Sequence, residues 1–173
     1  IIMAFDECTP YPCEYEYAKK SMEMTLRWAM RCKQRHEILS EELKHRPCQT
    51  LFGIVQGSIY PDLRIHCANE LASMELPGYA IGGLAVGEPR NNMLEIVAET
   101  TPHMPLKKPR YLMGVGLPHD MVESVGLGID MFDCVVPTRN ARNGTAFTKS
   151  GRIRLKNAKY SENSQPIDET CQC

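Results

Sequence analysis

The fold is constrained most by a regular alternation of short apolar runs with longer amphipathic segments along most of the chain. Five apolar runs have the length and composition of strands, at residues 1–5, 51–56, 79–84, 111–115 and 131–136. Helical periodicity lies between them, at residues 14–43, 61–76, 91–101 and from 118 onward. Strands that alternate with helices predict a parallel sheet in an α/β fold.

Each predicted strand carries one group of residues at its carboxyl end that differs from the apolar run. These residues are Asp6-Glu7-Cys8, Gln56-Gly57, Gly82-Gly83, Met113-Gly114 and Asp133. Five parallel strands suit either a doubly wound sheet or the later part of a (β/α)8 barrel. A doubly wound sheet that binds a dinucleotide carries G-x-G-x-x-G in its first turn, and the sequence has no such motif. In a barrel all strand ends converge on the mouth where the active site lies. We therefore predict the C-terminal part of a (β/α)8 TIM barrel, with about five strands, over residues 1–144.

One stretch, residues 129–144, combines an acid with cations. Asp133 stands in an apolar run that predicts a strand as far as Pro137, and Arg139 and Arg142 follow on a predicted Gly/Asn turn. A carboxylate among apolar neighbours is costly to bury unless it is paired or functional, so Asp133 is a candidate nucleophile or general base. An Asp that only accepts hydrogen bonds from backbone N–H groups is the alternative.

The net charge of −1 hides an uneven distribution of charge. Seven basic residues and no acidic one lie between Cys134 and Ser161, which leaves 13 basic against 21 acidic residues in the rest of the chain. This basic strip comprises Arg139, Arg142, Lys149, Arg152, Arg154, Lys156 and Lys159. A solvated surface hairpin would usually mix both signs of charge, so the strip favours contact with nucleic-acid phosphates.

The two ends of the chain lead us to expect an internal piece of a longer protein. The chain begins with Ile1, directly in a predicted strand, and ends on Cys171-Gln-Cys173, which is typical of the opening of a metal-ligand cluster. Residues 145–173 therefore predict a basic hairpin and the truncated start of a zinc-binding subdomain. No apolar run reaches the roughly 18 residues that span a bilayer. Six of the cysteines are scattered, without the spacing of a secreted disulfide scaffold, so we expect a cytoplasmic protein with reduced thiols and no membrane partner.

Six motifs in consistent order resemble those of the tRNA-guanine transglycosylases, also named queuine tRNA-ribosyltransferases, of the bacterial type. They are FDECTPYP at 5–12, LFGIVQGS at 51–58, YAIGGLAVGE at 79–88, YLMGVG at 111–116, DMFDCVVPTR at 130–139 and the C-x-C pair that opens at Cys171. The resemblance covers essentially the whole chain. It implies a (β/α)8 barrel with a zinc subdomain, and an enzyme of queuosine biosynthesis that exchanges guanine at the wobble position of certain tRNAs for a 7-deazaguanine base.

The resemblance gives Asp133 the role of the nucleophile. Asp133 would attack ribose C1′, expel guanine and form a covalent intermediate with the tRNA, which the incoming base would then resolve. Asp130 lies at the other end of the predicted strand and is assigned a structural role. The second catalytic Asp of the family, in a Ser-Asp-Gly-Gly-Gly-like segment, is absent from these 173 residues. The chain alone is therefore expected to be inactive.

Base recognition falls by resemblance on Asp6, Gln56 and Gly83. A guanine-like edge presents N1–H and an exocyclic amine, which one carboxylate can accept together. It also presents O6, to which a Gln amide and a backbone N–H can donate. Glycine lets the backbone approach the base closely.

Three more residues complete the expected base pocket. Leu84, through its peptide group, and Glu88 would by resemblance adapt the pocket to guanine or to an aminomethyl-bearing base, and Met113 would pack on the ring face. Cys8 and Val86 resemble the residues of bacterial enzymes that use preQ1, whereas relatives that accept the bulkier queuine carry smaller residues there. We therefore expect guanine and preQ1 as the bases.

The resemblance also implies partners and a metal. Arg139 and Arg142 match positions that hold tRNA phosphates around the flipped nucleotide. Cys171 and Cys173 match the first two ligands of one structural Zn²⁺ site per subunit, whose other Cys and His would lie beyond residue 173, so the site is incomplete in this chain. A tRNA with a G-U-N anticodon and a homodimer are the further expectations.

Two other functions remain open from the sequence. A non-catalytic tRNA-binding subunit, or an inactive fragment of such an enzyme, would share the fold, but the retention of Asp133, Asp6 and Gln56 argues against it. A phosphate-binding metabolic barrel would use Gly82-Gly83 as its anion site. A steep salt dependence of tRNA binding would separate the metabolic barrel from an RNA-binding enzyme.

Overall fold

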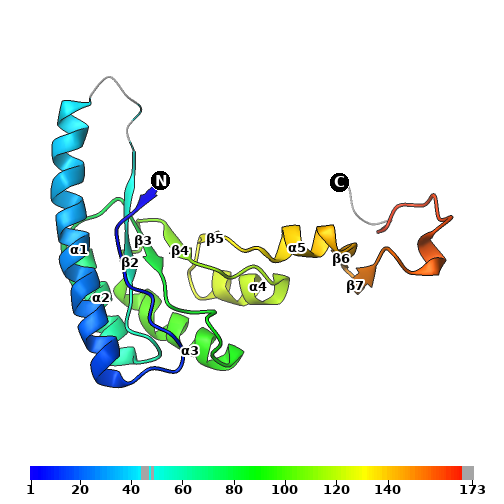
Figure 1. The fold of residues 1–173 in the computed structure, drawn as a ribbon, viewed down its shortest axis with the longest axis horizontal. Helices are drawn as coiled ribbons and strands as arrows, with labels where there is room; N and C mark the ends of the chain where they lie inside the picture. Colours follow the sequence, from blue (N-terminus) through cyan, green and yellow to red (C-terminus); the bar gives the residue numbers. More distant parts are fainter. Residues whose placement is uncertain (44–46, 48, 169–173) are drawn as a thin grey trace. The chain divides into compact units, whose positions relative to one another are not determined.

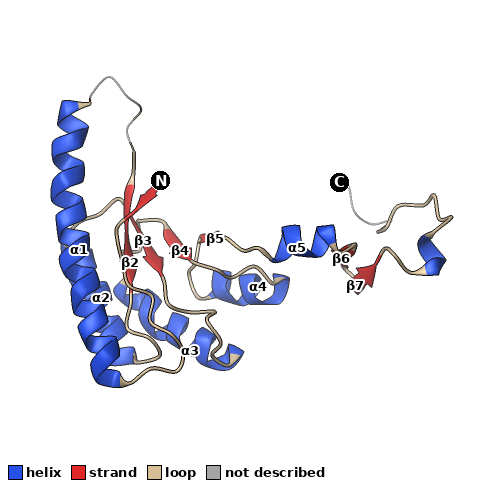
Figure 2. Ribbon diagram, viewed as in Figure 1, coloured by secondary structure: helices blue, strands red, loops and turns tan. Residues whose placement is uncertain are grey.

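A five-stranded parallel sheet organises the first part of the chain (Figures 1 and 2). Its strands are β1 (Ile2–Met3), β2 (Leu51–Val55), β3 (Gly78–Ile81), β4 (Arg110–Leu112) and β5 (Met131–Phe132). Each strand pairs in parallel with the next one along the chain, in the order β1-β2-β3-β4-β5. A doubly wound sheet reverses its strand order at a switch point, whereas a barrel keeps the sequence order. The predicted α/β class is therefore confirmed, and the sheet is a parallel half-barrel.

The computed structural model describes residues 1–43, 47 and 49–168. These residues belong to two compact units, the first formed by Ile1–Asp133 and the second beginning at Cys134. The sheet lies wholly in the first unit. The predicted division of the protein after residue 144 concerns the complete barrel and stays a prediction.

The helices of the first unit connect the strands and form one layer. They are α1 (Tyr15–Glu42), α2 (Pro61–Ser73), α3 (Arg90–Thr100) and α4 (Pro118–Gly126), with the 3-10 turn η1 (Thr101–His103) after α3. Neighbouring helices along the chain contact one another, α1 with α2, α2 with α3 and α3 with α4. The buried stripe of α1 includes Ala18, Met22 and Ala29, as its helical spacing predicts. No helix in the described residues combines the length and the apolarity needed to span a bilayer.

The core of the first unit lies between the sheet and this layer of helices. Every residue of β2 and β3 is buried, which is expected of the central strands of a parallel sheet. The two outer strands, β1 and β5, are only half-buried.

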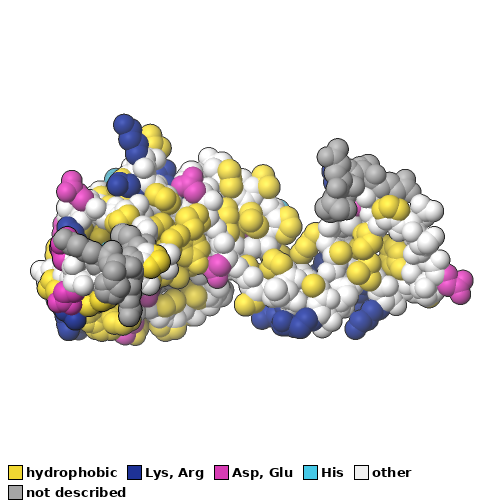
Figure 3. All heavy atoms as spheres, turned by 90° about the horizontal axis from the view of Figure 1, so that it is seen from above, with side chains coloured by type: hydrophobic (Ala, Val, Ile, Leu, Met, Phe, Trp, Pro, Cys, Tyr) yellow, Lys and Arg dark blue, Asp and Glu magenta, His cyan; other side chains and the backbone are white. Residues whose placement is uncertain are grey.

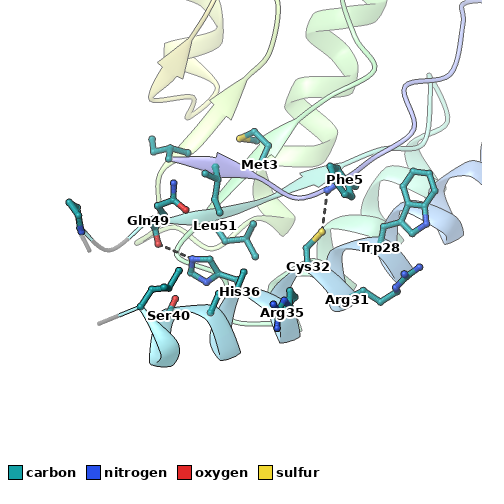
Figure 4. A pocket seen from close by; sticks show the side chains of 15 residues that line it. Met3, Phe5, Trp28, Arg31, Cys32, Arg35, His36, Ser40, Gln49 and Leu51 are labelled. Carbon is teal, nitrogen blue, oxygen red and sulfur yellow. Dashed lines mark hydrogen bonds between the residues drawn. The ribbon is translucent and has the colours of Figure 1, made fainter. Parts of the chain in front are cut away.

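An apolar groove borders β1 (Figure 4). A cavity of about 1110 Å³ lies between β1 and the C-terminal half of α1, and Ile1 and Phe5 on its wall expose 66% and 74% of their surface. The Phe5 N–H donates to Cys32 Sγ at 3.5 Å. In a closed barrel the next strand and helix would pack at such an edge.

The last strand is shorter than the sequence predicts. A strand is expected as far as Val136, but β5 ends at Phe132, and the helix α5 (Val136–Arg142) follows. Pro137 lies in the first turn of α5, where proline is favoured because its missing N–H has no helical partner there. Arg139 and Arg142 are therefore on a helix, and the predicted Gly/Asn turn at these residues is wrong.

The second unit contains α5, a hairpin and a 3-10 turn. The hairpin pairs β6 (Thr145–Thr148) with β7 (Gly151–Arg154) in antiparallel register, and η2 (Ala158–Tyr160) follows it. This pairing confirms the basic hairpin that was predicted within residues 145–173. Cys171 and Cys173 lie outside the described residues, so the zinc-binding subdomain stays a prediction.

Candidate active site

The carboxyl ends of the five strands lie side by side at one end of the sheet, because the strands run parallel and pair in register. This edge carries the predicted site residues Asp6 after β1, Gln56 after β2, Gly82-Gly83 after β3, Met113 after β4 and Asp133 after β5. Two groups of side chains at this edge are held by hydrogen bonds. One group is centred on Asp133, and the other on Asp6 and Gln56.

Asp133 is held through one carboxylate oxygen. Its Oδ1 accepts a hydrogen bond from the phenol of Tyr111 at 2.6 Å and another from the backbone N–H of Gly114 at 2.9 Å. The pairing of β4 with β5 brings these residues together, since Tyr111 lies opposite Met131 in the register. Oδ2 has no hydrogen-bond partner among the described residues. One oxygen therefore fixes the side chain, and the other is free to attack an electrophile.

The surroundings of Asp133 differ from those predicted. The apolar run predicts a buried carboxylate, but Asp133 is exposed. It directly follows β5, which has only two residues and is the last strand of the sheet. Tyr111 is half-buried, and burial together with its hydrogen bond to Asp133 raises the pKa of the phenol to about 12. The phenol therefore keeps its proton near neutral pH and remains a donor to Asp133.

Asp6 and Gln56 form the second group. Gln56 Nε2 donates to Asp6 Oδ2 at 2.7 Å, and Gln56 is only 1% exposed. A carboxylate oxygen requires a donor, so this contact assigns the orientation of the Gln56 amide and leaves the second hydrogen of Nε2 for another acceptor. Gln56 Oε1 is buried and has no partner among the described residues. The pair thus retains unused hydrogen-bonding capacity at the end of β2.

Gly82 and Gly83 lie very close to this pair. A Cβ on Gly83 would be 2.3 Å from Gln56 Oε1, and a Cβ on Gly82 would be 2.7 Å from Gln56 Nε2. Gly83 also has a φ of +65°, in the left-handed region that favours glycine. Cys8 is an exposed residue of the same segment as Asp6, and partial burial of its thiol, followed by the charge of Asp6, raises the pKa of the thiol.

A buried arginine ties the ends of β2 and β3 together. Arg64, on α2, has no exposed surface. It donates to four backbone carbonyls, from Nε to Ser58 (2.7 Å), from Nη1 to Val55 (2.9 Å) and Gly82 (2.7 Å), and from Nη2 to Gly83 (3.3 Å). Burial lowers the pKa of the guanidinium to about 10, so the group is still charged at neutral pH. Arg64 therefore fixes the backbone of the two glycines that lie against Gln56.

Glu88 holds the loop that follows Gly83. Its carboxylate accepts the backbone N–H of Ala85 at 2.5 Å and that of Val86 at 3.0 Å. Ala85 has a φ of +58°, a conformation that costs a residue with a Cβ about 1–2 kcal/mol. The N–H and C=O of a trans peptide point in opposite directions, so the Leu84 carbonyl points away from Glu88. Glu88 therefore sets the orientation of the Leu84–Ala85 peptide.

The other predicted residues are not linked to these groups by hydrogen bonds within the part of the chain that the structure describes. Met113 is half-buried after β4, and Arg139 and Arg142 are exposed on α5 in the second unit. Cys171 and Cys173 lie outside the described residues, among which no cluster of His, Cys, Asp and Glu could hold a metal ion. Ring packing, phosphate contact and zinc binding by these five residues stay predictions.

Sequence reasoning missed Arg64 and Tyr111. Arg64 shares the buried face of α2 with Ala68 and Leu71, and a cation on an apolar helical stripe is the signal that could have identified it. Tyr111 opens the predicted fourth strand, but its contact with Asp133 depends on the register of β4 against β5, which the sequence does not reveal.

The whole chain, residues 1–173, matches a family described as queuine tRNA-ribosyltransferase. Curated proteins with this name are 57% identical in Thermoanaerobacter sp. (strain X514), 55% in Bacillus subtilis (strain 168) and 54% in Desulforamulus reducens. Each similarity covers 100% of this chain and 44–45% of the relative. The chain thus spans less than half the length of the curated relatives that it matches.

Proposed function

The chain belongs to the queuine tRNA-ribosyltransferase family, in its bacterial type, and on this premise we propose that a full-length protein containing it is a tRNA-guanine transglycosylase. Such a protein would exchange guanine at the anticodon wobble position of tRNA for preQ1, a step of queuosine biosynthesis. The observation that carries the proposal is the geometry of Asp133, whose Oδ1 is fixed by Tyr111 and Gly114 while Oδ2 is free.

Asp133 performs a double displacement in this proposal. Its Oδ2 bonds to ribose C1′ of the wobble nucleotide, the bond from C1′ to N9 breaks, and guanine leaves with the bonding electrons and takes up a proton. The matching ring nitrogen of preQ1 then attacks C1′ and loses its proton, while the bond to Asp133 breaks. Two displacements at one carbon retain its configuration. We assign the proton transfers to the second catalytic Asp, which the resemblance places outside these 173 residues.

Asp6, Gln56 and Gly83 read the base in this proposal. Asp6 accepts the N1–H and the exocyclic amine, while the second hydrogen of Gln56 Nε2 and the N–H of Gly83 donate to O6. The 2.7 Å contact between Asp6 and Gln56 supports this assignment, because it keeps the acceptor and the donor side by side. Met113 packs on the ring face.

Replacing Gly83 by Ala is expected to weaken binding of the free base. The new Cβ would lie 2.3 Å from Gln56 Oε1, so Gln56 must move and its hydrogen bond to Asp6 is lost. Unpairing buried polar groups costs about 1–3 kcal/mol, which predicts a KM for the base about ten- to a hundred-fold higher in the full-length protein. Gly151→Ala is the control for strain alone, because Gly151 has a φ of +112° and a Cβ added there would have no atom within 4 Å. A similar KM for both variants would contradict the prediction.

Glu88 and the Leu84–Ala85 peptide are proposed to select between the two bases. The Leu84 carbonyl, which points away from Glu88, would accept a hydrogen bond from the protonated aminomethyl group of preQ1, a cation that guanine lacks. The left-handed Ala85 supports this assignment, because a strained turn is ready to change its orientation when another base binds.

Glu88→Gln is therefore expected to lower the preference for preQ1 over guanine. Each backbone N–H is accepted by a different carboxylate oxygen, Ala85 by Oε1 and Val86 by Oε2, and in Gln an NH₂ group that cannot accept replaces one of these oxygens. Loss of one charge-assisted hydrogen bond predicts a kcat/KM for preQ1 that falls about ten-fold, with a smaller fall for guanine. The measurement is kcat/KM for each base in parallel reactions, and equal decreases for both bases would refute the selecting role.

Further partners follow from the same proposal. Arg139 and Arg142 contact tRNA phosphates next to the flipped wobble nucleotide of a G-U-N anticodon. Cys171 and Cys173 supply two thiolates to a structural zinc site, whose chemistry fits this donor pair and which needs two further ligands from outside the chain. Zinc would stabilise the fold of its subdomain. A cytoplasmic homodimer completes the proposal.

The 173 residues alone are proposed to be inactive. β1 leaves one edge of the sheet open, and the apolar groove of about 1110 Å³ beside it fits the packing of a preceding strand and helix (Figure 4). The relatives, of which the chain spans 44–45%, are long enough to supply the rest of a barrel. All activity measurements therefore require the full-length protein.

Incorporation of labelled guanine into unmodified tRNA by the full-length protein tests the proposed function. A folded, zinc-loaded protein that incorporates guanine supports base exchange. The same protein binding tRNA without incorporation would favour the non-catalytic tRNA-binding subunit instead.

A further inference from the structure

A second cavity lies wholly within the second unit, and none of the site residues discussed so far lines it. Its volume is about 500 Å³, and it is formed between α5 and the β6–β7 hairpin. The lining residues are Asn140, Asn143, Thr145, Arg152, Arg154, Lys156 and Asn157. The lining thus combines three cations with four neutral hydrogen-bonding side chains and contains no acid. Figure 3 shows Lys and Arg side chains along one side of this unit.

The hairpin register explains how the cations come together. Arg152 and Arg154 are two residues apart on β7, so their side chains emerge on the same face of the hairpin. Thr145 pairs directly with Arg154 across the two strands and therefore shares that face. Ile153, between the two arginines, faces the other side and is half-buried. Because side chains alternate along a strand, the guanidinium groups of Arg152 and Arg154 lie on the same face as the hydroxyl of Thr145.

Lys156 is held against the same wall by its hydrocarbon stem. A Cβ on Gly144 would lie 3.2 Å from Lys156 Cγ, so the absence of a side chain at Gly144 gives the stem its place. Gly144 follows Asn143, the C-cap of α5, with a φ of +68° and leads directly into β6, and its carbonyl accepts the N–H of Leu155 at 2.8 Å. The turn that joins α5 to the hairpin therefore also positions Lys156.

The cations of the cavity have no ion-pair partner among the residues of this unit that the structure describes. No ion pair joins Arg152, Arg154 or Lys156 to an acid in the described residues. Other cations of the basic strip lie outside the cavity, among them Lys149 at the hairpin turn and Lys159, whose Nζ lies 4.8 Å from the ring centroid of Tyr160. Three cations of one sign, gathered in one concave site, attract a strongly anionic group.

We propose that this cavity binds a backbone phosphate of tRNA, as a second phosphate site separate from the one assigned to Arg139 and Arg142. The guanidinium groups of Arg152 and Arg154 suit the bidentate geometry of phosphate oxygens, Lys156 adds a point charge, and the Asn amides add neutral donors. None of these groups requires a particular base, so the site contributes affinity without sequence preference. This inference rests on the proposed function, because it takes tRNA as the ligand.

The test compares equal losses of charge inside and outside the cavity. The probe is an unmodified tRNA transcript with a G-U-N anticodon, bound to the zinc-loaded full-length protein at several salt concentrations. Arg154→Gln and Lys156→Gln remove cations from the cavity, and Lys149→Gln and Lys159→Gln remove the same charge elsewhere in the basic strip. A thermal midpoint for each variant shows that it is folded.

The double variant Arg154→Gln with Lys156→Gln is expected to bind tRNA about ten-fold or more weakly than the double control Lys149→Gln with Lys159→Gln. The slope of log K against log salt should also fall by about 0.7–0.9 for the lost phosphate contact, beyond any change in the control. Equal affinities and slopes in the two double variants would overturn the site. Binding of inorganic phosphate that depends on Arg154 and Lys156, with an unchanged tRNA slope, would also overturn it in favour of a free-anion site.

Failure of this inference is distinguishable from failure of the proposed function. The salt slope measures binding and does not depend on base exchange. A protein that incorporates no guanine, but whose slope falls only in the cavity variant, would refute the enzyme and retain the phosphate site. Normal guanine incorporation by the parent, with equal salt slopes in both double variants, would support the enzyme and refute the phosphate site.

Discussion

Asp133→Asn is expected to reduce guanine incorporation by the full-length protein at least about 10⁴-fold, the scale seen when a covalent nucleophile is removed from an enzyme. The Asn Oδ1 can still accept from the Tyr111 phenol and the Gly114 N–H, at the positions now 2.6 and 2.9 Å from the carboxylate oxygen. The amide NH₂ then replaces Oδ2, the free oxygen. The variant should therefore keep its local geometry and its tRNA affinity while losing the atom that bonds to C1′.

Asp130→Asn is the matched control for this prediction. Asp130 lies at the other end of β5, where its Oδ2 accepts the backbone N–H of Arg110 at 2.9 Å, and an Asn can accept the same hydrogen bond. Labelled guanine incorporation and the covalent tRNA adduct on a denaturing gel are measured for both variants, with tRNA binding as the check of folding. An Asp133→Asn protein that exchanges guanine at the parental rate, or an Asp130→Asn protein that loses as much activity, would remove Asp133 from the role of nucleophile.

The sheet was predictable because the sequence patterns that indicate strands and helices are local and periodic. Apolar runs of strand length, separated by helical periodicity, predict β1 to β5 in the correct order. The end of the last strand was not predictable in this way. Val135 and Val136 are apolar and β-branched, which favours a strand, but α5 begins at Val136 and has Pro137 in its first turn. A proline after an apolar run can end a strand or begin a helix, and only the tertiary context decides between them.

The location of the candidate site could be predicted, but its contacts could not. Parallel strands place Asp6, Gln56 and Asp133 at one edge of a sheet whatever the details of packing. The hydrogen bonds that hold these side chains depend on register and on side-chain direction. Tyr111 contacts Asp133 because β4 pairs with β5. Arg64 lies on α2 and donates to the carbonyl of Gly82, which follows β3. Such contacts are set by the three-dimensional fold.

Arg64→Met is expected to destabilise the protein by about 2–4 kcal/mol. The carbonyls of Ser58, Gly82 and Gly83 would lose the donor that Arg64 supplies, at about 1–3 kcal/mol each. The Val55 carbonyl would keep the N–H of Gly82 at 3.1 Å. Removal of a buried charge offsets part of this loss, because a guanidinium without exposed surface has given up its hydration.

The pH dependence of the Arg64→Met effect has a definite sign. Burial lowers the pKa of Arg64 from 12.5 to about 10 in the folded state. Between about pH 6 and pH 9 the folded and unfolded states both hold the proton, so the difference in stability between parent and variant should be constant. Above pH 10 the unfolded state binds more protons than the folded state, so the stability of the parent should rise relative to the variant.

Thermal midpoints of the full-length protein measure the loss, and a fall of about 5 °C or more is expected for Arg64→Met. Arg64→Lys should fall nearly as far, because an ammonium keeps the charge but cannot reach the carbonyls of both Ser58 and Gly82. Asn69→Met places the same new side chain on the exposed face of α2 and should stay within about 0.5 kcal/mol of the parent.

The KM for the base should rise in both Arg64 variants, since Gly82 and Gly83 lose the group that fixes them. A stable Arg64→Met protein with a parental KM would show that the backbone of these glycines is held by the sheet alone, and that the buried guanidinium has no part in positioning the site.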